Sequence, residues 1–319
     1  MEPPVPGDRG VGASCLPTDP AASHGLGEAV KSRRYRFLAL SLIGVLAAVG
    51  CQGCGPSAQR FSTGRKPPAP SLRLPPGRSP SVGDPLRVMV VGDSIMQSAE
   101  PGLVAALEAT GVAHVVYDDA MPGWGLVNHS PTRNLDYDWR SQWPSLIERY
   151  RPELVVGMWT WDDDVAQADP AYYNRVLKQA LSILLDRGDG VDGVVLLAVP
   201  ALDPSPGYLA FYRSTGWTRQ STVSGLEAAG ASWDHLASSV ARQEGGRVVY
   251  STATAAAGTR GRATDGVHFC PAGAVVLGAA VAGQLASLLH LAQPSPGWQP
   301  RVAMDPFYAV QPGLCPRPT

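Results

Sequence analysis

LRVMVVGDSIMQS, residues 86–98, joins a run typical of a buried strand to the start of a helix through a Gly-Asp-Ser turn. The apolar half, rich in Val and Met, ends at Gly92, and the polar residues Asp93 and Ser94 follow at once. A strand-turn-helix corner of this kind lifts a serine side chain clear of the sheet and leaves free backbone N–H groups beside it. Ser94 is therefore a candidate nucleophile, provided that the chain supplies a base.

Short apolar runs alternate with helix-like stretches over residues 86–291. The runs are β-branched and nearly continuous, as in strands buried on both faces, and cover 87–91, 112–117, 153–158, 193–199 and 246–251. The helix-like stretches cover 99–110, 139–150, 171–186, 221–242 and 271–291. This order predicts an α/β fold, a three-layer α/β/α sandwich around a central, mostly parallel five-stranded sheet. Ligands of such sheets bind at the carboxyl ends of the strands, where Ser94 lies.

Size and charge set broad limits on function. With 319 residues, 45% of them hydrophobic, the chain can bury the core of one large domain or two small ones. Its 26 basic and 27 acidic residues give a formal net charge of −1. Because this balance creates no strong field, we expect a neutral substrate and no nucleic-acid partner.

The amino-terminal region has the pattern of a leader and an export signal. Residues 1–30 are rich in Pro, Gly and Ala without periodicity, which predicts disorder. Residues 31–54 hold a basic flank, the uncharged apolar run 37–50 and Cys51. The run is short for a membrane span, so ordinary cleavage, lipidation of Cys51 and an uncleaved anchor all stay open, with a core helix as the alternative without export. The export interpretations predict a domain that is outside the cytoplasm and membrane-tethered.

Proline-rich segments flank the predicted domain, residues 86–292, on both sides. Residues 55–85 read as an extended, solvated tether, and residues 293–319 as a proline-rich tail. In an oxidising compartment, Cys270 and Cys315 could pair and pin the tail beside the loop that carries His268. Two such cysteines make no metal site, and no phosphate-cradling glycine loop occurs, so we expect no cofactor.

A base is offered by the loop ATDGVHFCPAGA, residues 263–274, just before the last helix. Asp265 and His268 are three residues apart, so in a turn the carboxylate can reach Nδ1 of the imidazole and leave Nε2 free to face a hydroxyl. The competing interpretation is a turn-capping aspartate beside a structural histidine. The other five histidines lie in the leader, in strand or helix segments, or in an ordinary loop.

A Gly-Asp-Ser turn after the first strand and an Asp-x-x-His loop before the last helix together resemble the SGNH (GDSL-like) hydrolase family, over about residues 86–291. The resemblance implies that Ser94 is the nucleophile, His268 the base and then the acid, and Asp265 the residue that orients the imidazole. It also implies an oxyanion hole that includes the N–H groups of Ser94 and Gly123, with Gly125 as a substitute.

The third block of the family departs from its pattern in this chain. The resemblance implies an asparagine after the third strand, but the sequence reads GMWTWDDD, residues 157–164, and Asp162 takes that place. A carboxylate facing an oxyanion would repel it, which leaves a protonated Asp162, a donor from Thr160 or Trp161, or a dead site. Variants of this block are familiar from SGNH domains linked to cell-surface acyl transfer.

These expectations converge on an exported serine esterase or acyltransferase that removes or transfers small acyl groups, most simply acetyl, on envelope or extracellular carbohydrate. The alternative is an inactive SGNH-like module that binds carbohydrate or serves envelope assembly. Five tryptophans after strands two and three could stack on sugar rings or simply pack against the sheet: Trp124, Trp139, Trp143, Trp159 and Trp161.

Overall fold

The computed structural model describes residues 72–127, 137–186, 190–214, 221–309 and 313–315. The predicted leader, the signal or anchor segment and the tether up to residue 71 lie outside the described residues. All five apolar runs predicted as strands lie within them.

Five parallel strands form one central sheet in the order β2-β1-β3-β4-β5. They are β1 (Leu86–Gly92), β2 (Ala113–Ala120), β3 (Leu154–Met158), β4 (Gly193–Leu197) and β5 (Val248–Ser251). The chain leaves β1 toward β2 on one side and then crosses to β3 on the other side, so the strand order reverses at β1. The carboxyl edge at such a switch point is where open α/β sheets bind their ligands, and the predicted five-stranded α/β sheet is confirmed.

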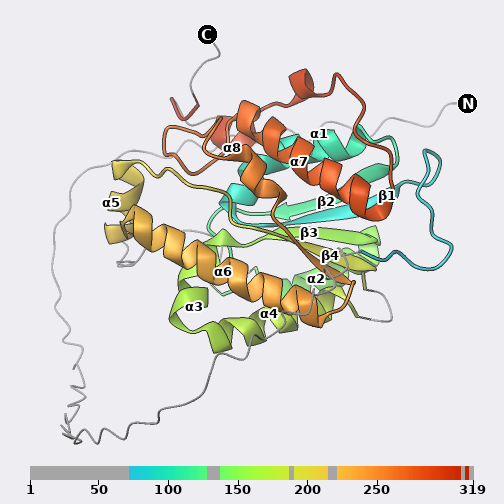
Figure 1. Cartoon of the computed structure of the whole chain (residues 1–319), viewed down its shortest axis with the longest axis horizontal. Helices are drawn as coiled ribbons and strands as arrows, with labels where there is room; N and C mark the ends of the chain where they lie inside the picture. Colours follow the sequence, from blue (N-terminus) through green and yellow to red (C-terminus); the bar gives the residue numbers. More distant parts are fainter. Residues whose placement is uncertain (1–71, 128–136, 187–189, 215–220, 310–312, 316–319) are drawn as a thin grey trace, which may run out of the picture. The chain divides into compact units, whose positions relative to one another are not determined.

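Helices cover both faces of the sheet (Figure 1). One layer holds α1 (Ser94–Glu108) and α7 (Pro271–Leu289), and the other holds α2 (Trp139–Tyr150), α4 (Pro170–Leu184) and α6 (Val223–Gln243). Residues of β1 alternate between the layers: Val88 and Val90 pack in the α1–α7 core, and Met89 and Val91 pack in the opposite core. The sandwich therefore has two cores, as expected for strands buried on both faces.

The elements differ from the sequence prediction mainly at their ends and in short helices. Helix α1 begins at Ser94 instead of residue 99, because the carboxylate of Asp93 caps it by accepting hydrogen bonds from the amides of Ile95 and Met96. Three short helices were not predicted: α3 (Asp163–Ala168), α5 (Pro206–Ser214) and α8 (Pro306–Ala309). Two of them, α5 and α8, line the carboxyl edge of the sheet, and both carry tyrosines.

Both flanks of the predicted domain pack against it. Leu72 is buried against Gly193, and Arg78 forms an ion pair with Glu153, so the described end of the tether is docked instead of solvated. On the other flank, Trp298 of the tail is buried in the α1–α7 core. The disulfide between Cys270 and Cys315 is present, with a Cα–Cα distance of 5.7 Å.

Helices α1 and α7 approach so closely that glycine is required at their crossing. A Cβ on Gly102 would lie 2.0 Å from the carbonyl oxygen of Ala274, and a Cβ on Gly278 would lie 2.2 Å from the carbonyl oxygen of Gly102. Helix α7 is apolar and long enough to span a membrane by composition, but here it contributes its buried face to the α1–α7 core. This crossing ties the helix that begins at Ser94 to the helix that follows His268.

We predict that Gly278→Ala lowers the free energy of unfolding by about 1–3 kcal/mol, because the new methyl group meets backbone that cannot move without separating the helices. Gly283→Ala on the same helix is the matched control, since its Cβ would lie 3.4 Å from the Gln293 side chain. The control should be neutral or stabilising by up to about 1 kcal/mol through helix propensity. Urea unfolding of both variants measures the difference, and equal stabilities would contradict the close crossing.

Candidate active site

Ser94 is the first residue of α1, directly after the carboxyl end of β1. Its neighbour Asp93 has 0% exposure, and its carboxylate also accepts a hydrogen bond from the hydroxyl of Thr160 after β3. Asp93 therefore holds the turn rigid from two sides, and Ser94 presents its backbone N–H at the positive end of the α1 dipole. A developing negative charge beside Ser94 would be stabilised there.

His268 and Asp265 form one compact turn. Nδ1 of His268 lies 2.6 Å from Oδ2 of Asp265, and Oδ1 of Asp265 accepts hydrogen bonds from the amides of Val267 and His268 at 2.8 and 3.0 Å. Burial alone would raise the pKa of the Asp265 carboxyl, but the hydrogen bond from His268 and these amides outweigh it, so the pKa is lowered. An ionised carboxylate thus orients the imidazole, with Nε2 on the opposite side of the ring.

The structure brings Ser94 and His268 to the same end of α1. One helical turn after Ser94, Oγ of Ser98 accepts a hydrogen bond of 3.0 Å from the amide of Phe269, the residue after His268. Tyr308 touches both: its hydroxyl donates to the carbonyl oxygen of Ser94 at 2.8 Å, and its ring centroid lies 5.0 Å from that of His268. The predicted nucleophile and base therefore share neighbours across 174 positions of sequence (268 − 94).

Nε2 of His268 and the hydroxyl of Ser94 are not hydrogen-bonded to each other in this structure. Nε2 of His268 is buried, and among the described residues it has no hydrogen-bond partner, the hydroxyl of Ser94 included. Catalytic hydrogen bonds are often long without substrate and tighten when it binds. In this structure the imidazole nitrogen that would act on Ser94 is therefore shielded from solvent and not bonded to the serine.

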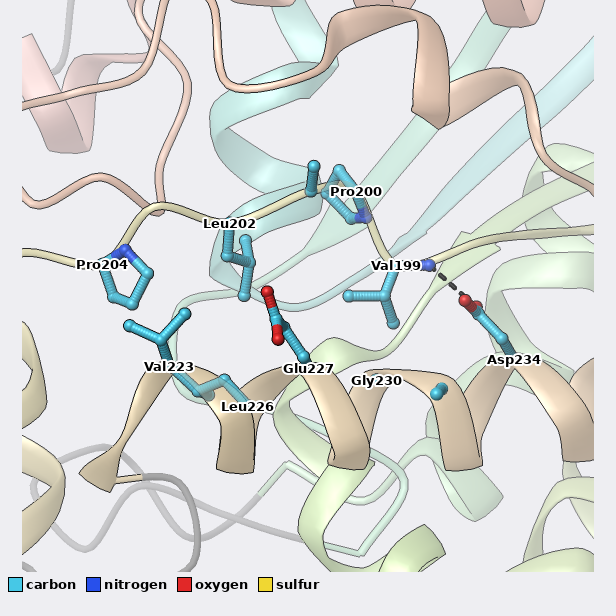
Figure 2. Close-up of a pocket in the computed structure, with 11 residues that line it drawn as sticks. Val199, Pro200, Leu202, Pro204, Val223, Leu226, Glu227, Gly230 and Asp234 are labelled. Carbon is cyan, nitrogen blue, oxygen red and sulfur yellow. Dashed lines mark hydrogen bonds between the residues drawn. The ribbon is translucent and has the colours of Figure 1, made fainter.

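The space in front of Ser94 is small. A cavity of about 10 Å³ is lined by Ser94, Ile95, Thr160, Asp163, Leu202, Tyr208, Tyr212, Leu226 and Val267, room for about one water molecule. A larger cavity of about 200 Å³ lies between the loop after β4 and helix α6, and it shares Leu202 and Leu226 with the small one. Figure 2 shows that Leu202, Pro204 and Val223 point into this larger cavity, with the carboxylate of Glu227 beside them.

Gly123 lies in a turn that follows β2. The amide of Trp124 donates to the carbonyl oxygen of Met121 at 3.3 Å, and Gly123 has a φ of 73°, which matches a type II turn with Pro122 at its second position. The amide of Met121 donates to the carbonyl oxygen of Gly92 at 2.9 Å, which fixes this turn to the end of β1. Gly123 is thus placed at the same sheet edge as Ser94, as an oxyanion donor requires.

The expectation that Asp162 belongs to the oxyanion hole needs correction. Its carboxylate has 0% exposure and accepts hydrogen bonds from the amides of Leu126 and Val127 and from the hydroxyl of Tyr173. These donors hold Asp162 as a buried link between the β2 loop and α4, so it is not a donor to substrate. A Cβ on Gly125 would lie 2.2 Å from Oδ1 of Asp162, so the close packing of this carboxylate requires a glycine at position 125.

The neighbouring residues of the third block, the candidate donors Thr160 and Trp161 and also Asp163, have other surroundings. The hydroxyl of Thr160 donates its one hydrogen bond to the carboxylate of Asp93, so it cannot also donate to an oxyanion. Asp163 lines the small cavity with Ser94. The side chain of Trp161 lies outside the described residues.

The tryptophan faces considered for sugar stacking are used for packing. Trp124, Trp139, Trp143 and Trp159 are each no more than 5% exposed. Trp139 and Trp143 pack at 5.2 Å between ring centroids, and Trp143 and Trp159 at 5.9 Å. Burial of Asp119 among them raises the pKa of its carboxyl to about 6, although hydrogen bonds from Tyr137 and Trp143 oppose the rise. These four rings therefore belong to the core and offer no platform to a ligand.

Sequence reasoning missed three residues that shape the site. Ser98 links α1 to the His268 loop by a hydrogen bond. The rings of Tyr208 in α5 and Tyr308 in α8 both contact the imidazole of His268, with centroid distances of 6.2 and 5.0 Å. Only Ser98 carried a usable signal, because it lies one turn after Ser94 on the predicted helix. Among the described residues, no three His, Cys, Asp or Glu side chains gather as a metal site would require.

We predict that Asp265→Asn lowers the stability of the full chain by about 1–3 kcal/mol at pH 7, because the imidazole and two amides lose an ionised acceptor. Since the folded-state pKa of Asp265 is lowered, its contribution is present above about pH 4 and is lost as the pH falls through the folded-state value. Urea unfolding between pH 7 and pH 2 should show the gap between wild type and variant closing. A gap that does not depend on pH would contradict the ionised turn.

Comparison with known proteins bears on the fold. Residues 87–284 match the model of a family described as protein of unknown function (DUF459). No curated protein sequence matches the chain.

Three of the solved structures to which this chain is similar are described as esterases. An inhibitor-bound aryl esterase from M. smegmatis has 20% identity and a TM-score of 0.50, over 63% of this chain and 99% of its own. A carbohydrate acetylesterase from Sinorhizobium meliloti has 18% identity and a TM-score of 0.49, over 63% and 99%. An acetyl xylan esterase from Geobacillus stearothermophilus has 16% identity and a TM-score of 0.39, over 64% and 94%. The likeness to the aryl esterase confirms the predicted SGNH-type fold, and at this identity it extends no further than the fold.

Proposed function

The chain belongs to the DUF459 family, and from the geometry around Ser94 we propose that it is a serine ester hydrolase that acts through an acyl-serine intermediate. The observation that carries the proposal is the Asp265–His268 hydrogen bond in a loop fixed to the first turns of α1, where Ser94 begins the helix. This arrangement supports the proposed roles of Ser94 as nucleophile, His268 as base and Asp265 as the orienting carboxylate, which covalent ester hydrolysis requires at one site.

The reaction proceeds in two balanced steps. Oγ of Ser94 attacks the ester carbonyl while Nε2 of His268 takes its proton, and the same nitrogen then protonates the departing alcohol. Water next attacks the acyl-serine, gives a proton to His268 and releases the carboxylic acid as Ser94 recovers its hydrogen. Throughout, Asp265 balances the charge of the imidazolium, and the N–H groups of Ser94 and Gly123 stabilise the oxyanion.

A small acyl group suits the cavity at Ser94 best. Its volume of about 10 Å³ means that side chains must move to admit any acyl group, and the smallest acyl group requires the least movement. Leu202 and Leu226 line both this cavity and the larger one. An acetylated carbohydrate is the substrate class that we favour, in line with the resemblance to SGNH esterases. Transfer of the acyl group to a sugar hydroxyl instead of water would use the same acyl-serine, and released acetate distinguishes hydrolysis from it.

We also propose that the domain works outside the cytoplasm, tethered to a membrane through residues 31–54. The Cys270–Cys315 disulfide supports this location, because disulfides persist in oxidising compartments. Protease accessibility on intact cells tests the location of the domain, and loss of membrane association in Cys51→Ser tests the lipid anchor. Protection of the domain from added protease would contradict export.

We predict that Ser94→Ala abolishes both p-nitrophenyl acetate hydrolysis and labelling by a fluorophosphonate, because no other hydroxyl replaces the nucleophile. His268→Gln should lower the rate by a factor of about 10⁴ or more, as removal of a triad base does. Ser182→Ala, at an exposed position on α4, is the control and should keep full activity. Glycan binding by wild type and Ser94→Ala without any turnover would favour the inactive-module alternative.

Acyl-chain selectivity gives a separate prediction. Leu226→Ala should join the two cavities and raise the ratio of kcat/KM for p-nitrophenyl hexanoate over acetate by on the order of tenfold. Val223→Ala changes the larger cavity alone, so its ratio should stay at the wild-type value. Equal ratios in all three proteins would show that acyl chains do not extend toward Leu226.

A further inference from the structure

The tail that follows the family-matched region reaches into the candidate active site. The match to the family model ends at residue 284, and Tyr308 lies 24 residues beyond it (308 − 284). Its side chain has 3% exposure, its hydroxyl donates to the carbonyl oxygen of Ser94, and its ring lies against the imidazole of His268. One residue outside the family domain thus touches both members of the proposed catalytic pair.

The tail is held at several points before and after Tyr308. Ser295 donates two hydrogen bonds to the carbonyl oxygen of Ala109 at the end of α1, and Trp298 is buried beside that helix. After α8, Leu314 accepts a hydrogen bond of 2.7 Å from the amide of Thr264, and Cys315 is bonded to Cys270. Because Cys270 is two residues from His268, the disulfide joins the tail to the loop of the base.

We propose that Tyr308 is a positioning residue for the Ser94–His268 pair and that the Cys270–Cys315 disulfide keeps it in place. The proposal rests on the proposed function, since it concerns the same nucleophile and base. The phenol holds the first turn of α1 through the Ser94 carbonyl oxygen, and its ring limits the rotation of an imidazole that Asp265 holds only at Nδ1. The tail completes the active site, and the domain matched by the family model lacks one of its walls.

Burial of the base supports this role. Nε2 of His268 is buried, and the imidazole is flanked by the rings of Tyr208, at 6.2 Å, and Tyr308, at 5.0 Å. Tyr208 comes from α5 of the domain, whereas Tyr308 comes from the tail alone. Removal of Tyr308 would let water reach one side of the ring and would leave the imidazole free to rotate about its bond to Asp265.

The test measures the rate of fluorophosphonate labelling of the full chain at Ser94. Tyr308→Phe removes the hydrogen bond and keeps the ring, so we expect a loss of about fivefold, the equivalent of one neutral hydrogen bond. Tyr308→Ala removes both and should lose on the order of 30-fold. Tyr250→Phe is the matched control, because this half-buried hydroxyl bonds to Asp234 near β5 and lies outside the residues that touch Ser94 or His268. It should label at the wild-type rate.

The disulfide gives a second, independent arm. Cys270→Ser/Cys315→Ser should lower the labelling rate toward that of Tyr308→Ala, and the same pair of substitutions made in Tyr308→Ala should lower it little further. This non-additivity is expected if the disulfide acts through Tyr308. Full additivity of the losses would overturn the link between the disulfide and Tyr308.

Rescue by the conservative variant distinguishes positioning from simple loss of stability. All variants are labelled under conditions in which circular dichroism shows them folded. Tyr308→Phe should recover most of the rate that Tyr308→Ala loses, because its ring can still lie against the imidazole of His268.

The outcomes separate the two proposals. Wild-type labelling rates in both Tyr308 variants would overturn the positioning role while leaving the esterase proposal intact. Absence of labelling in the wild type itself would overturn the proposed function, and the inference about Tyr308 with it.

Discussion

The geometry of the candidate active site depends on one hydrogen bond, from the amide of Phe269 to Oγ of Ser98. It joins the loop of His268 to the helix that begins at Ser94, and both partners are buried. The Gly102–Gly278 crossing behind it keeps α1 and α7 at a fixed separation. Because Oγ of Ser98 also donates to the carbonyl oxygen of Ile95 at 2.8 Å, the serine is locked in one rotamer. The separation of Ser94 and His268 thus follows from helix packing.

The parts of the fold that the sequence predicts well are those set by local pattern. The five apolar runs became the five strands, and the helix over residues 139–150 was predicted with its observed bounds, because buried parallel strands and amphipathic helices leave a periodic signal. Asp265 and His268 were found for a similar reason, since their contact spans three residues. The start of α1 was predicted too late because residues 94–98 show no helical pattern of apolar residues. The helix nevertheless begins at Ser94, since the side chain of Asp93 caps it.

What the sequence could not predict depends on contacts between distant segments. Asp162 looked like an altered oxyanion residue, yet its partners are amides of residues 126 and 127 in the loop after β2. The tail looked like proline-rich coil, but Trp298 and Tyr308 are buried, and a short helix such as α8 has almost no periodicity to detect. Tyr308 contacts Ser94 through its hydroxyl and His268 through its ring, and neither contact leaves a signal in the local sequence pattern.

The central claim is that Ser94 carries the acyl group during turnover. Rapid quenching of the full chain with p-nitrophenyl acetate, followed by peptide mass spectrometry, tests it most directly. The account predicts an acetyl group on the peptide that contains Ser94, at up to one per chain, which disappears as the ester is consumed. Steady hydrolysis with no acetyl group on that peptide, or with the acetyl group on another residue, would contradict it.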